Sequence, residues 1–452
     1  MKTNLKRREF FKYLGLSWLT IGTLPGRLSA SLQTGEQPAN ILFILTDQHR
    51  QDGVGAYGND KVSTPTLDRL ADDGIRFNNM YTAQPVCAPN RGSILSGLYP
   101  HSHGVLENTW SLSPRIKTLA EMLNQQGYNC GYFGKWHLDR SNKQGFTTFP
   151  DYPADGRGSN HTFEINGETR YAPEVITDDV INFVSEDRIA PFFAFASFYP
   201  PHPPYSVPEK YEKMYQDTYP DDEQRRIYYA NCTAIDDQVK RLVNTLERNN
   251  QIQNTLVIFT SEHGHYFEHR WNDHAKRLCY DIAAVVPLIV KMPGKIPAGQ
   301  VSDALISSVD LPQTIHGLLG VPQPEGLQGV DMSPVATGKT GQIRDAVFIE
   351  NYPYINKGET PGKFSNEPDW LRGVERAVRN DRWKLILSDV RKPELFDMKN
   401  DRDESDNLWE KMHTSAEAQE LLIKLHRWGI ETGDNIAPKL VSKYLITESE
   451  SS

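Results

Sequence analysis

Four apolar segments, each followed by a cluster of polar residues, constrain the fold of this 452-residue chain more than any other feature. They have the length and the β-branched or aromatic content of buried strands, and they span residues 40–46, 129–133, 191–199 and 255–260. Helical patterns lie between them, over residues 66–73, 118–126 and 227–249. This alternation predicts an α/β fold in which helices cover both faces of a sheet. Because ligands of such sheets bind beyond the carboxyl ends of the strands, we expect the four polar clusters to converge on one site.

The sequence changes character after about residue 340. Strand-like segments and then an amphipathic helical pattern follow, over residues 346–350, 383–387 and 414–432. A stretch rich in Gly, Pro and Gln, residues 320–340, precedes them and favours a domain boundary there. We therefore predict a large domain over residues 31–340 and a smaller α+β domain over residues 341–452.

The first 30 residues have the features of a twin-arginine export signal. Arg7 and Arg8 precede an apolar run over residues 13–24, and a small-residue sequence follows it and ends at Ala30. The run is too short to span a bilayer comfortably, so we expect cleavage near Ala30 rather than anchoring. No second apolar segment approaches membrane length. The signal predicts a protein that is exported to the periplasm or secreted and has no membrane span.

Charge and cysteine usage exclude several classes of protein. The formal charge of -9 argues against a protein that coats nucleic acid or an anionic surface. An anionic substrate must therefore be held by local basic residues. The four cysteines have no C-x-x-C spacing, so neither a disulfide framework nor a thiolate zinc site is indicated; they are Cys87, Cys130, Cys232 and Cys279.

Acidic residues follow two of the predicted strands. The first strand runs into Asp47-Gln48-His49, and the fourth runs into Ser261-Glu262-His263. Carboxylates with an amide and an imidazole beside them suit a divalent cation bound mainly by oxygen. An acidic residue after a strand is also common in turns and helix caps, so either interpretation is open for each cluster alone.

Cys87 is the strongest candidate for a reactive side chain. Pro89 and the run that follows it place Cys87 at the N-terminus of a helix, where backbone amides and the helix dipole favour an anion. A buried structural cysteine is the alternative. A thiolate nucleophile would require a neighbouring base, and His137 and His202 are candidates.

The segment from Cys87 to Arg91 reads C-A-P-N-R and resembles the C-x-P-x-R signature of the sulfatase family. Further motifs match that family in its order: residues 40–47, 134–138, 201–204, 261–269 with Lys276, and 394–397 with 407–408. Six ordered motifs across nearly the whole chain are far more specific than one short match. The resemblance implies an alkaline-phosphatase-like α/β fold, with a mixed sheet between helices and a smaller α+β C-terminal domain. It also implies that the 31–340 domain catalyses sulfate ester hydrolysis.

In the sulfatase family, a separate maturation enzyme oxidises the signature cysteine to formylglycine, and the resemblance assigns this modification to Cys87. The hydrated aldehyde carries two hydroxyls on one carbon. One attacks sulfur, and the second, once deprotonated, collapses to the aldehyde and expels sulfate. Water therefore does not have to attack sulfur.

The resemblance also assigns roles to five other residues. Arg91 would hold the formylglycine oxygens, Lys135 would act as a fixed cation, and His137 would be the base for the collapse. His202 and Lys276 would bind the sulfate oxygens, and one of the two would protonate the leaving alcohol oxygen.

The metal ligands implied by the resemblance depart from the family's commonest pattern. They are Asp47, Gln48, Cys87 as formylglycine, Glu262 and His263. Gln48 replaces a second Asp, Glu262 replaces an Asp, and His263 stands where Asn is frequent. We expect Ca²⁺ by resemblance. Fewer carboxylates and an imidazole leave Mn²⁺, Mg²⁺ and Zn²⁺ open.

Export points to a substrate outside the cell, and a sulfated carbohydrate is the expected partner. Oligomeric state leaves no signal in the sequence. Loop histidines, arginines and polar or aromatic residues are candidates for binding the sugar: His101, His103, Asn108, Trp110, Arg157, Tyr205, His265, His269 and Arg270.

Two alternative functions are open at this point. The first is a phosphodiester or phosphonate monoester hydrolase, since branches of the same superfamily carry the Gln and His metal variants. The second is an inactive sugar-binding relative. A binding module needs no nucleophile together with its base, so Cys87 and His137 argue against the second alternative.

Overall fold

The computed structural model describes residues 38–267, 276–353 and 373–445. The predicted export signal over residues 1–30 lies outside these ranges, as do His269 and Arg270. The strands are β1 (Asn40–Asp47), β2 (Ile75–Tyr81), β3 (Asn129–Gly134), β4 (Thr162–Ile165), β5 (Glu168–Tyr171), β6 (Phe192–Pro201), β7 (Thr255–Ser261), β8 (Val285–Lys291), β9 (Gln300–Ser307), β10 (Val347–Asn351), β11 (Glu375–Arg379), β12 (Trp383–Ser388) and β13 (Glu394–Asp397). The α-helices are α1 (Pro65–Asp72), α2 (Cys87–Ser96), α3 (Pro100–His103), α4 (Leu119–Asn124), α5 (Ala172–Ser185), α6 (Glu209–Glu212), α7 (Glu223–Arg248), α8 (Asp281–Ala284), α9 (Leu311–Leu319), α10 (Ser333–Ala336), α11 (Trp409–Met412), α12 (Ala416–Thr432) and α13 (Ala437–Val441).

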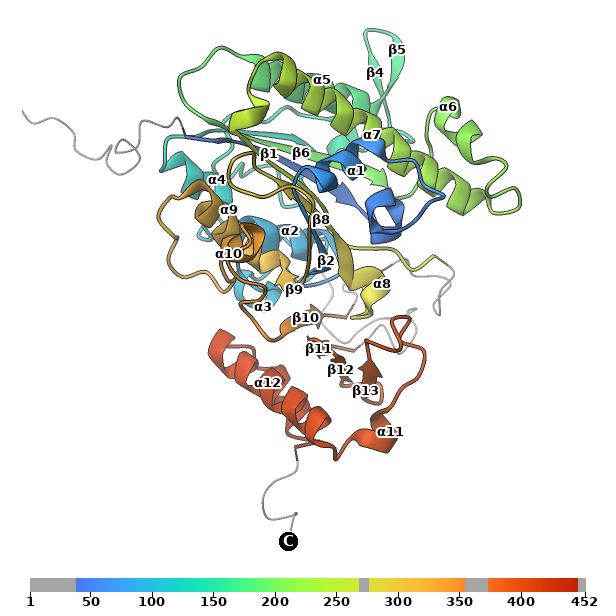
Figure 1. Ribbon diagram of the computed structural model, residues 1–452, viewed down its shortest axis with the longest axis vertical. Coiled ribbons are helices and arrows are strands. Elements are labelled where there is room, and N and C mark those ends of the chain that lie inside the picture. Colours follow the sequence, from blue (N-terminus) through green and yellow to red (C-terminus); the bar gives the residue numbers. More distant parts are fainter. Residues whose placement is uncertain (1–37, 268–275, 354–372, 446–452) are drawn as a thin grey trace, which may run out of the picture. The chain divides into compact units, whose positions relative to one another are not determined.

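A seven-stranded sheet in the order β3-β6-β1-β7-β8-β2-β9 forms the centre of the large domain (Figure 1). The first four strands in this order are parallel neighbours, whereas β8 runs antiparallel to both β7 and β2. The sheet is therefore mixed, as expected. The four strands predicted from apolar runs are the four parallel ones, so their carboxyl ends meet at one edge of the sheet.

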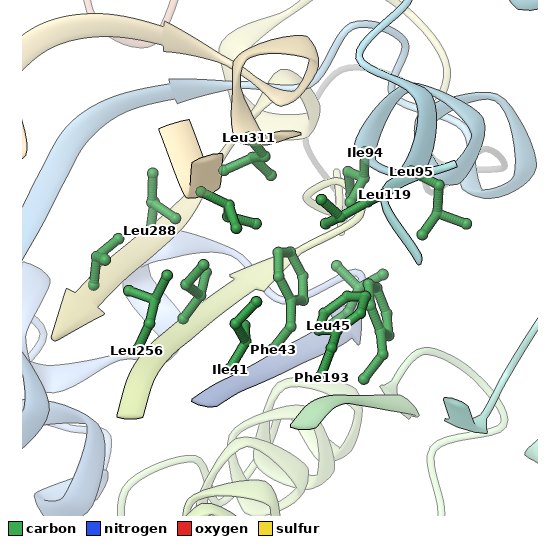
Figure 2. Close-up of a cluster of buried hydrophobic side chains, with 14 of the residues drawn as sticks. Ile41, Phe43, Leu45, Ile94, Leu95, Leu119, Phe193, Leu256, Leu288 and Leu311 are labelled. Atoms are coloured by element: carbon green, nitrogen blue, oxygen red, sulfur yellow. The ribbon is translucent and has the colours of Figure 1, made fainter. Parts of the chain in front are cut away.

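Side-chain alternation along β1 explains how helices cover both faces of the sheet. Ile41, Phe43 and Leu45 belong to one buried cluster, which also contains side chains of α2, α4 and α9 (Figure 2). Leu42 and Ile44 point to the opposite face and pack with α1, α5 and α7. Successive residues of a strand face opposite sides, so a wholly apolar strand requires cover on both.

The C-terminal part contains a second, antiparallel sheet in the order β10-β11-β12-β13. The predicted strands at 346–350 and 383–387 correspond to β10 and β12, and the predicted amphipathic helix corresponds to α12. Leucines of α12 pack with Leu385 and Leu387 of β12 in a common cluster. The boundary at residue 340 stays a prediction. No helix within the described ranges combines the length and apolar character needed to cross a membrane.

Gly134, at the end of β3, permits a close approach between β3 and β6. Its φ of 102° lies in the left-handed region, and a Cβ added there would lie 1.9 Å from the carbonyl oxygen of Ser197. We expect Gly134→Ala to lower the free energy of unfolding by about 3 kcal/mol or more, because the positive φ strains an alanine and its Cβ would also clash with the carbonyl oxygen of Ser197. Chemical denaturation measures this change.

Gly127 offers a matched control for Gly134. Its φ is 86°, but nothing lies within 4 Å of an added Cβ. Gly127→Ala should therefore cost only the backbone strain, about 1 kcal/mol. Equal losses in the two variants would show that the contact with Ser197 is unimportant.

Candidate active site

The carboxyl edge of the four parallel strands gathers the polar clusters that follow them. Asp47 ends β1, Lys135 follows β3, His202 follows β6, and Glu262 and His263 follow β7. Each of the five is at least partly buried at this edge. The predicted convergence of these clusters is confirmed by the contacts described below.

Cys87 is the first residue of α2 and is only 1 % exposed. Its Sγ lies 2.7 Å from Lys276 Nζ, 3.3 Å from His263 Nε2 and 3.7 Å from each Asp47 oxygen. Burial and the Asp47 carboxylate raise the pKa of the thiol. The neighbouring Lys135, Lys276 and His263 outweigh them, so the pKa of Cys87 lies well below its ordinary value. The site therefore stabilises negative charge at position 87.

The other three cysteines have the opposite electrostatics. All four are free and buried, but burial raises the pKa of Cys130 to about 12 and holds those of Cys232 and Cys279 well above the ordinary value. Burial alone thus makes a thiol inert. The cations around Cys87 are what distinguish it.

Arg91 and Lys135 form buried ion pairs with the acids at the strand ends. Lys135 Nζ lies 2.5 Å from Asp47 Oδ2 and 3.5 Å from Glu262 Oε2. Arg91 pairs with Glu262 Oε1 and donates to the carbonyl of Lys135 at 2.5 Å and to the hydroxyl of Ser197 at 2.9 Å. Burial alone would raise the pKa of Asp47, but nearby cations, foremost Lys135, hold it well below its ordinary value.

His202 lies on the other side of Asp47. Its Nε2 is 3.9 Å from Asp47 Oδ2, and its Nδ1 is 2.5 Å from the carbonyl oxygen of Pro203. Burial lowers the pKa of His202 to about 4, so the ring is neutral at pH 7. A neutral ring that donates from Nδ1 to Pro203 presents an unprotonated Nε2 towards Asp47.

Four of the predicted metal ligands lie close enough to share one ion. Donor atoms of Asp47, Cys87, Glu262 and His263 all lie within 4.8 Å of one another. Gln48, the fifth predicted ligand, has a φ of 64°, and its buried Oε1 accepts no hydrogen bond from the described residues. A buried amide oxygen without a partner is costly unless it binds something. The donor set therefore fits a divalent cation.

His137 lies in the loop after β3, beside a groove. Its φ is 61°, and Asp155 Oδ2 accepts its backbone N–H at 2.9 Å. Trp110 and Asn108 line the same groove. The structure thus brings His137 together with Trp110, one of the predicted sugar-binding residues.

His101 is bound by the C-terminal part of the protein. Its Nδ1 lies 2.7 Å from Glu350 Oε1, and its Nε2 lies 3.1 Å from the carbonyl oxygen of Thr432. The backbone N–H of Glu350 donates to the carbonyl of Ala83 at 2.8 Å. Both ring nitrogens of His101 are therefore used within the protein, and its contact with a sugar stays a prediction.

His103 is also structural. It is 3 % exposed, its Nε2 lies 3.1 Å from Ser93 Oγ, and the backbone N–H of Val105 donates to its Nδ1 at 3.1 Å. Burial lowers the pKa of His103 to about 3. Both ring nitrogens are thus used within the protein, and a role of His103 in sugar binding stays a prediction.

Acidification should destabilise the protein through His103. In the unfolded chain, His103 is protonated below its ordinary pKa, whereas in the folded protein it stays neutral down to about pH 3. The free energy of unfolding therefore falls as the pH falls from the ordinary pKa of histidine towards about 3. We expect His103 to account for about 2 kcal/mol of loss between about pH 7.5 and about pH 5. Denaturation of wild type and His103→Gln at both pH values measures this share. An unchanged pH slope in the variant would contradict it.

The other sugar-binding candidates contact neighbouring side chains or lie outside the described residues. Tyr205 Oη lies 2.6 Å from His265 Nε2, and the Arg157 guanidinium lies 5.8 Å from the centre of the Tyr199 ring. His269 and Arg270 fall in the segment that is not described.

A buried ion pair next to the site was not predicted from the sequence. Arg277 donates to both carboxylate oxygens of Glu107, at 2.6 and 3.0 Å. Arg277 adjoins Lys276, and Glu107 adjoins Asn108, whose Oδ1 accepts the N–H of Ala88 at 3.0 Å. The only signal for this pair in the sequence was that Arg277 follows the motif residue Lys276 and that Glu107 precedes the sugar-binding candidate Asn108.

The fold and the site define a hydrolase for esters of an oxyanion: a position that stabilises negative charge lies at a helix N-terminus, among buried cations and a donor set for a divalent metal. The chain belongs to the sulfatase family, since the family model described as Sulfatase matches residues 39–321. A second model, described as N-sulphoglucosamine sulphohydrolase, C-terminal, matches residues 267–429. The protein is therefore a sulfuric ester hydrolase, as the sequence motifs predicted.

Characterised relatives and a solved structure agree with this assignment. An ulvan-active sulfatase of Formosa agariphila is 29 % identical over 87 % of this chain and 82 % of its own length. An N-acetylglucosamine-6-O-sulfatase of Bacteroides thetaiotaomicron is 26 % identical over 88 % of this chain and 87 % of its own. A solved enzyme in complex with its substrate D-glucosamine-2-N,6-O-disulfate superimposes with a TM-score of 0.77 at 25 % identity, covering 88 % of this chain and 99 % of the other.

Proposed function

We propose that this sulfatase removes sulfate from saccharides, using Cys87 oxidised to formylglycine and a divalent cation, Ca²⁺. The relatives named for ulvan, for N-acetylglucosamine and for a glucosamine disulfate support the saccharide class. The observation that carries the chemistry is the 2.7 Å contact between Lys276 Nζ and Cys87 Sγ, with Lys135 and His263 also close enough to lower the pKa of Cys87. A sulfate ester placed there meets the nucleophile position and its charge partners together.

The residues around position 87 have different roles in the reaction. Lys276 and His202 bind the sulfate oxygens, and Arg91 and Lys135 fix the acids whose oxygens face position 87. Because Nε2 of neutral His202 carries no proton, His202 must be protonated before it can donate to a sulfate oxygen. His137, beside the groove, is the base that takes the proton of the second hydroxyl.

The cation is held by Asp47, Gln48, Glu262 and His263 together with an oxygen at position 87. A bound divalent cation lowers the pKa of a hydroxyl that it contacts and neutralises developing negative charge. Three of the four side chains offer oxygen, which favours Ca²⁺ over softer ions.

The enzyme is matured by the host and exported. A formylglycine-generating enzyme of the host converts Cys87, and the twin-arginine signal in residues 1–30 directs the protein to the periplasm or outside the cell. Saccharides too large to enter the cell are then accessible to it.

The test is turnover of an aryl sulfate and of sulfated monosaccharides by the purified protein, before and after treatment with a chelator. We expect activity to disappear with chelation and to return with Ca²⁺ more fully than with Mn²⁺, Mg²⁺ or Zn²⁺. Aryl phosphate and phosphonate monoesters should be poor substrates. Full activity in a metal-free protein, or a preference for the phosphorus esters, would refute the proposal.

A further inference from the structure

A groove of about 490 Å³ lies next to the first turn of α2, and of its lining residues only His137 has a role in the chemistry described so far. Its lining includes Asn108, Trp110, His137, Arg140 and Asp155. The volume falls within the range of about 300–1,000 Å³ that is typical of small-molecule sites. The groove combines one large aromatic side chain with several hydrogen-bonding groups.

Two contacts connect the groove to the catalytic centre. Asn108 Oδ1 accepts the N–H of Ala88, the residue next to Cys87, at 3.0 Å. On the other wall, His137 follows Lys135 by two residues, and Lys135 Nζ is 2.5 Å from Asp47. The groove therefore adjoins the first turn of α2, which begins with Cys87.

Trp110 forms a fixed wall of the groove. Its side chain is partly buried and packs against the large apolar cluster, and the backbone N–H of Trp110 donates to the backbone carbonyl of Glu107 at 3.0 Å. The carboxylate of Glu107 is in turn held by Arg277 and by the N–H of Asn108. Because this loop is already ordered, a ring that packs on Trp110 costs little conformational entropy.

The opposite wall is polar and equally fixed. Asp155 accepts the backbone N–H groups of Trp136 at 3.1 Å and His137 at 2.9 Å, and it pairs with Arg140 at 2.5 Å. Arg140 also lies over the ring of Phe149, 5.1 Å from its centre. Because both side chains are held in place, Asp155 can accept a hydrogen bond from a hydroxyl and Arg140 can donate one to a hydroxyl without either side chain moving.

We propose that this groove binds the pyranose ring that carries the sulfate ester, with Trp110 against the apolar face of the ring and Arg140 and Asp155 at its hydroxyl edge. A pyranose has an apolar C–H face and a rim of hydroxyls, which matches one aromatic wall and one polar wall. The inference rests on the proposed saccharide sulfatase function and names the residues that select its substrate.

The test compares wild type, Trp110→Ala and Trp110→Phe on N-acetylglucosamine 6-sulfate, galactose 6-sulfate and rhamnose 3-sulfate, and measures competitive inhibition by inorganic sulfate. For the sugar that wild type cleaves, Trp110→Ala should lower kcat/KM by about tenfold or more, mainly through KM. Trp110→Phe, which keeps a ring, should recover most of the loss. Inhibition by inorganic sulfate should be unchanged, because sulfate alone binds at position 87.

Each other outcome has a distinct meaning. Unchanged kcat/KM in Trp110→Ala overturns the subsite and leaves the sulfatase function intact. Equal loss of sugar turnover and of sulfate inhibition also overturns it, because the substitution has then damaged the catalytic centre. Cleavage of aryl sulfate with no cleavage of any sugar sulfate refutes the saccharide class, and the subsite with it.

Discussion

Replacement of Cys87 by alanine should abolish sulfate ester turnover, with a fall in kcat of about 10⁴-fold or more. The reason is that Lys135, Lys276 and His263 stabilise negative charge on the side chain at position 87, and an alanine there cannot carry it. Turnover of an aryl sulfate at saturating substrate measures the effect. The intact mass of the wild-type peptide that contains Cys87 should also lie about 18 Da below the value for a thiol, as expected for conversion to an aldehyde.

Cys279→Ala is the matched control for this prediction. Cys279 is also free and fully buried, but burial holds its pKa well above the ordinary value, so it has no reactive role. Its replacement should leave kcat within about twofold of wild type. If wild type with an unmodified Cys87 thiol is fully active, the formylglycine mechanism is wrong and a thiolate or metal-bound hydroxide must take its place.

Arg91→Ala should lower the free energy of unfolding by about 3–5 kcal/mol and eliminate activity. The side chain is 1 % exposed and pairs with Glu262, which is wholly buried. Removal of the guanidinium leaves that carboxylate without its main partner and leaves Ser197 without a donor. Chemical denaturation gives the stability, and aryl sulfate turnover gives the activity.

Arg241→Ala provides the comparison for Arg91. Arg241 pairs with Asp178 near the surface, where both side chains are more than one-third exposed. Its loss should cost about 1 kcal/mol or less and leave turnover unchanged. Should Arg91→Ala fail to fold, Arg91→Lys keeps the charge but loses the planar guanidinium that contacts Glu262, Ser197 and the Lys135 carbonyl together, so it should fold and remain poorly active. Comparable stability of Arg91→Ala and Arg241→Ala would contradict this account.

The parts of the fold that could be predicted are those whose residues carry a one-dimensional pattern. The four parallel strands are continuous apolar runs because both of their faces are covered. Strands β2, β8 and β9 were missed. Asn78 and Asn79 interrupt β2 at a register shift, and Pro287 lies within β8, which argues against a strand by pattern alone.

The catalytic centre could be located from sequence because its residues follow strand ends or belong to family motifs. The ion pairs that hold these residues in place could not be predicted, because they join residues far apart in the chain, such as Glu107 and Arg277. The roles of the individual histidines could not be predicted from the sequence for the same reason. His101 and His103 are as suitable in composition as His202, and only their three-dimensional contacts show that their ring nitrogens are already used.

Glu350 and Glu375 connect the C-terminal sheet to two segments of the catalytic part of the chain. The backbone N–H of Glu350 in β10 donates to the carbonyl of Ala83, four residues before Cys87, and the Glu350 carboxylate pairs with His101. The Glu375 carboxylate in β11 accepts the N–H of Cys279, three residues after Lys276. The C-terminal sheet thus braces two segments that carry catalytic groups. An exchange of C-terminal domains between relatives transfers part of the active-site scaffold, so a functional chimera has to inherit these glutamates and their partners together.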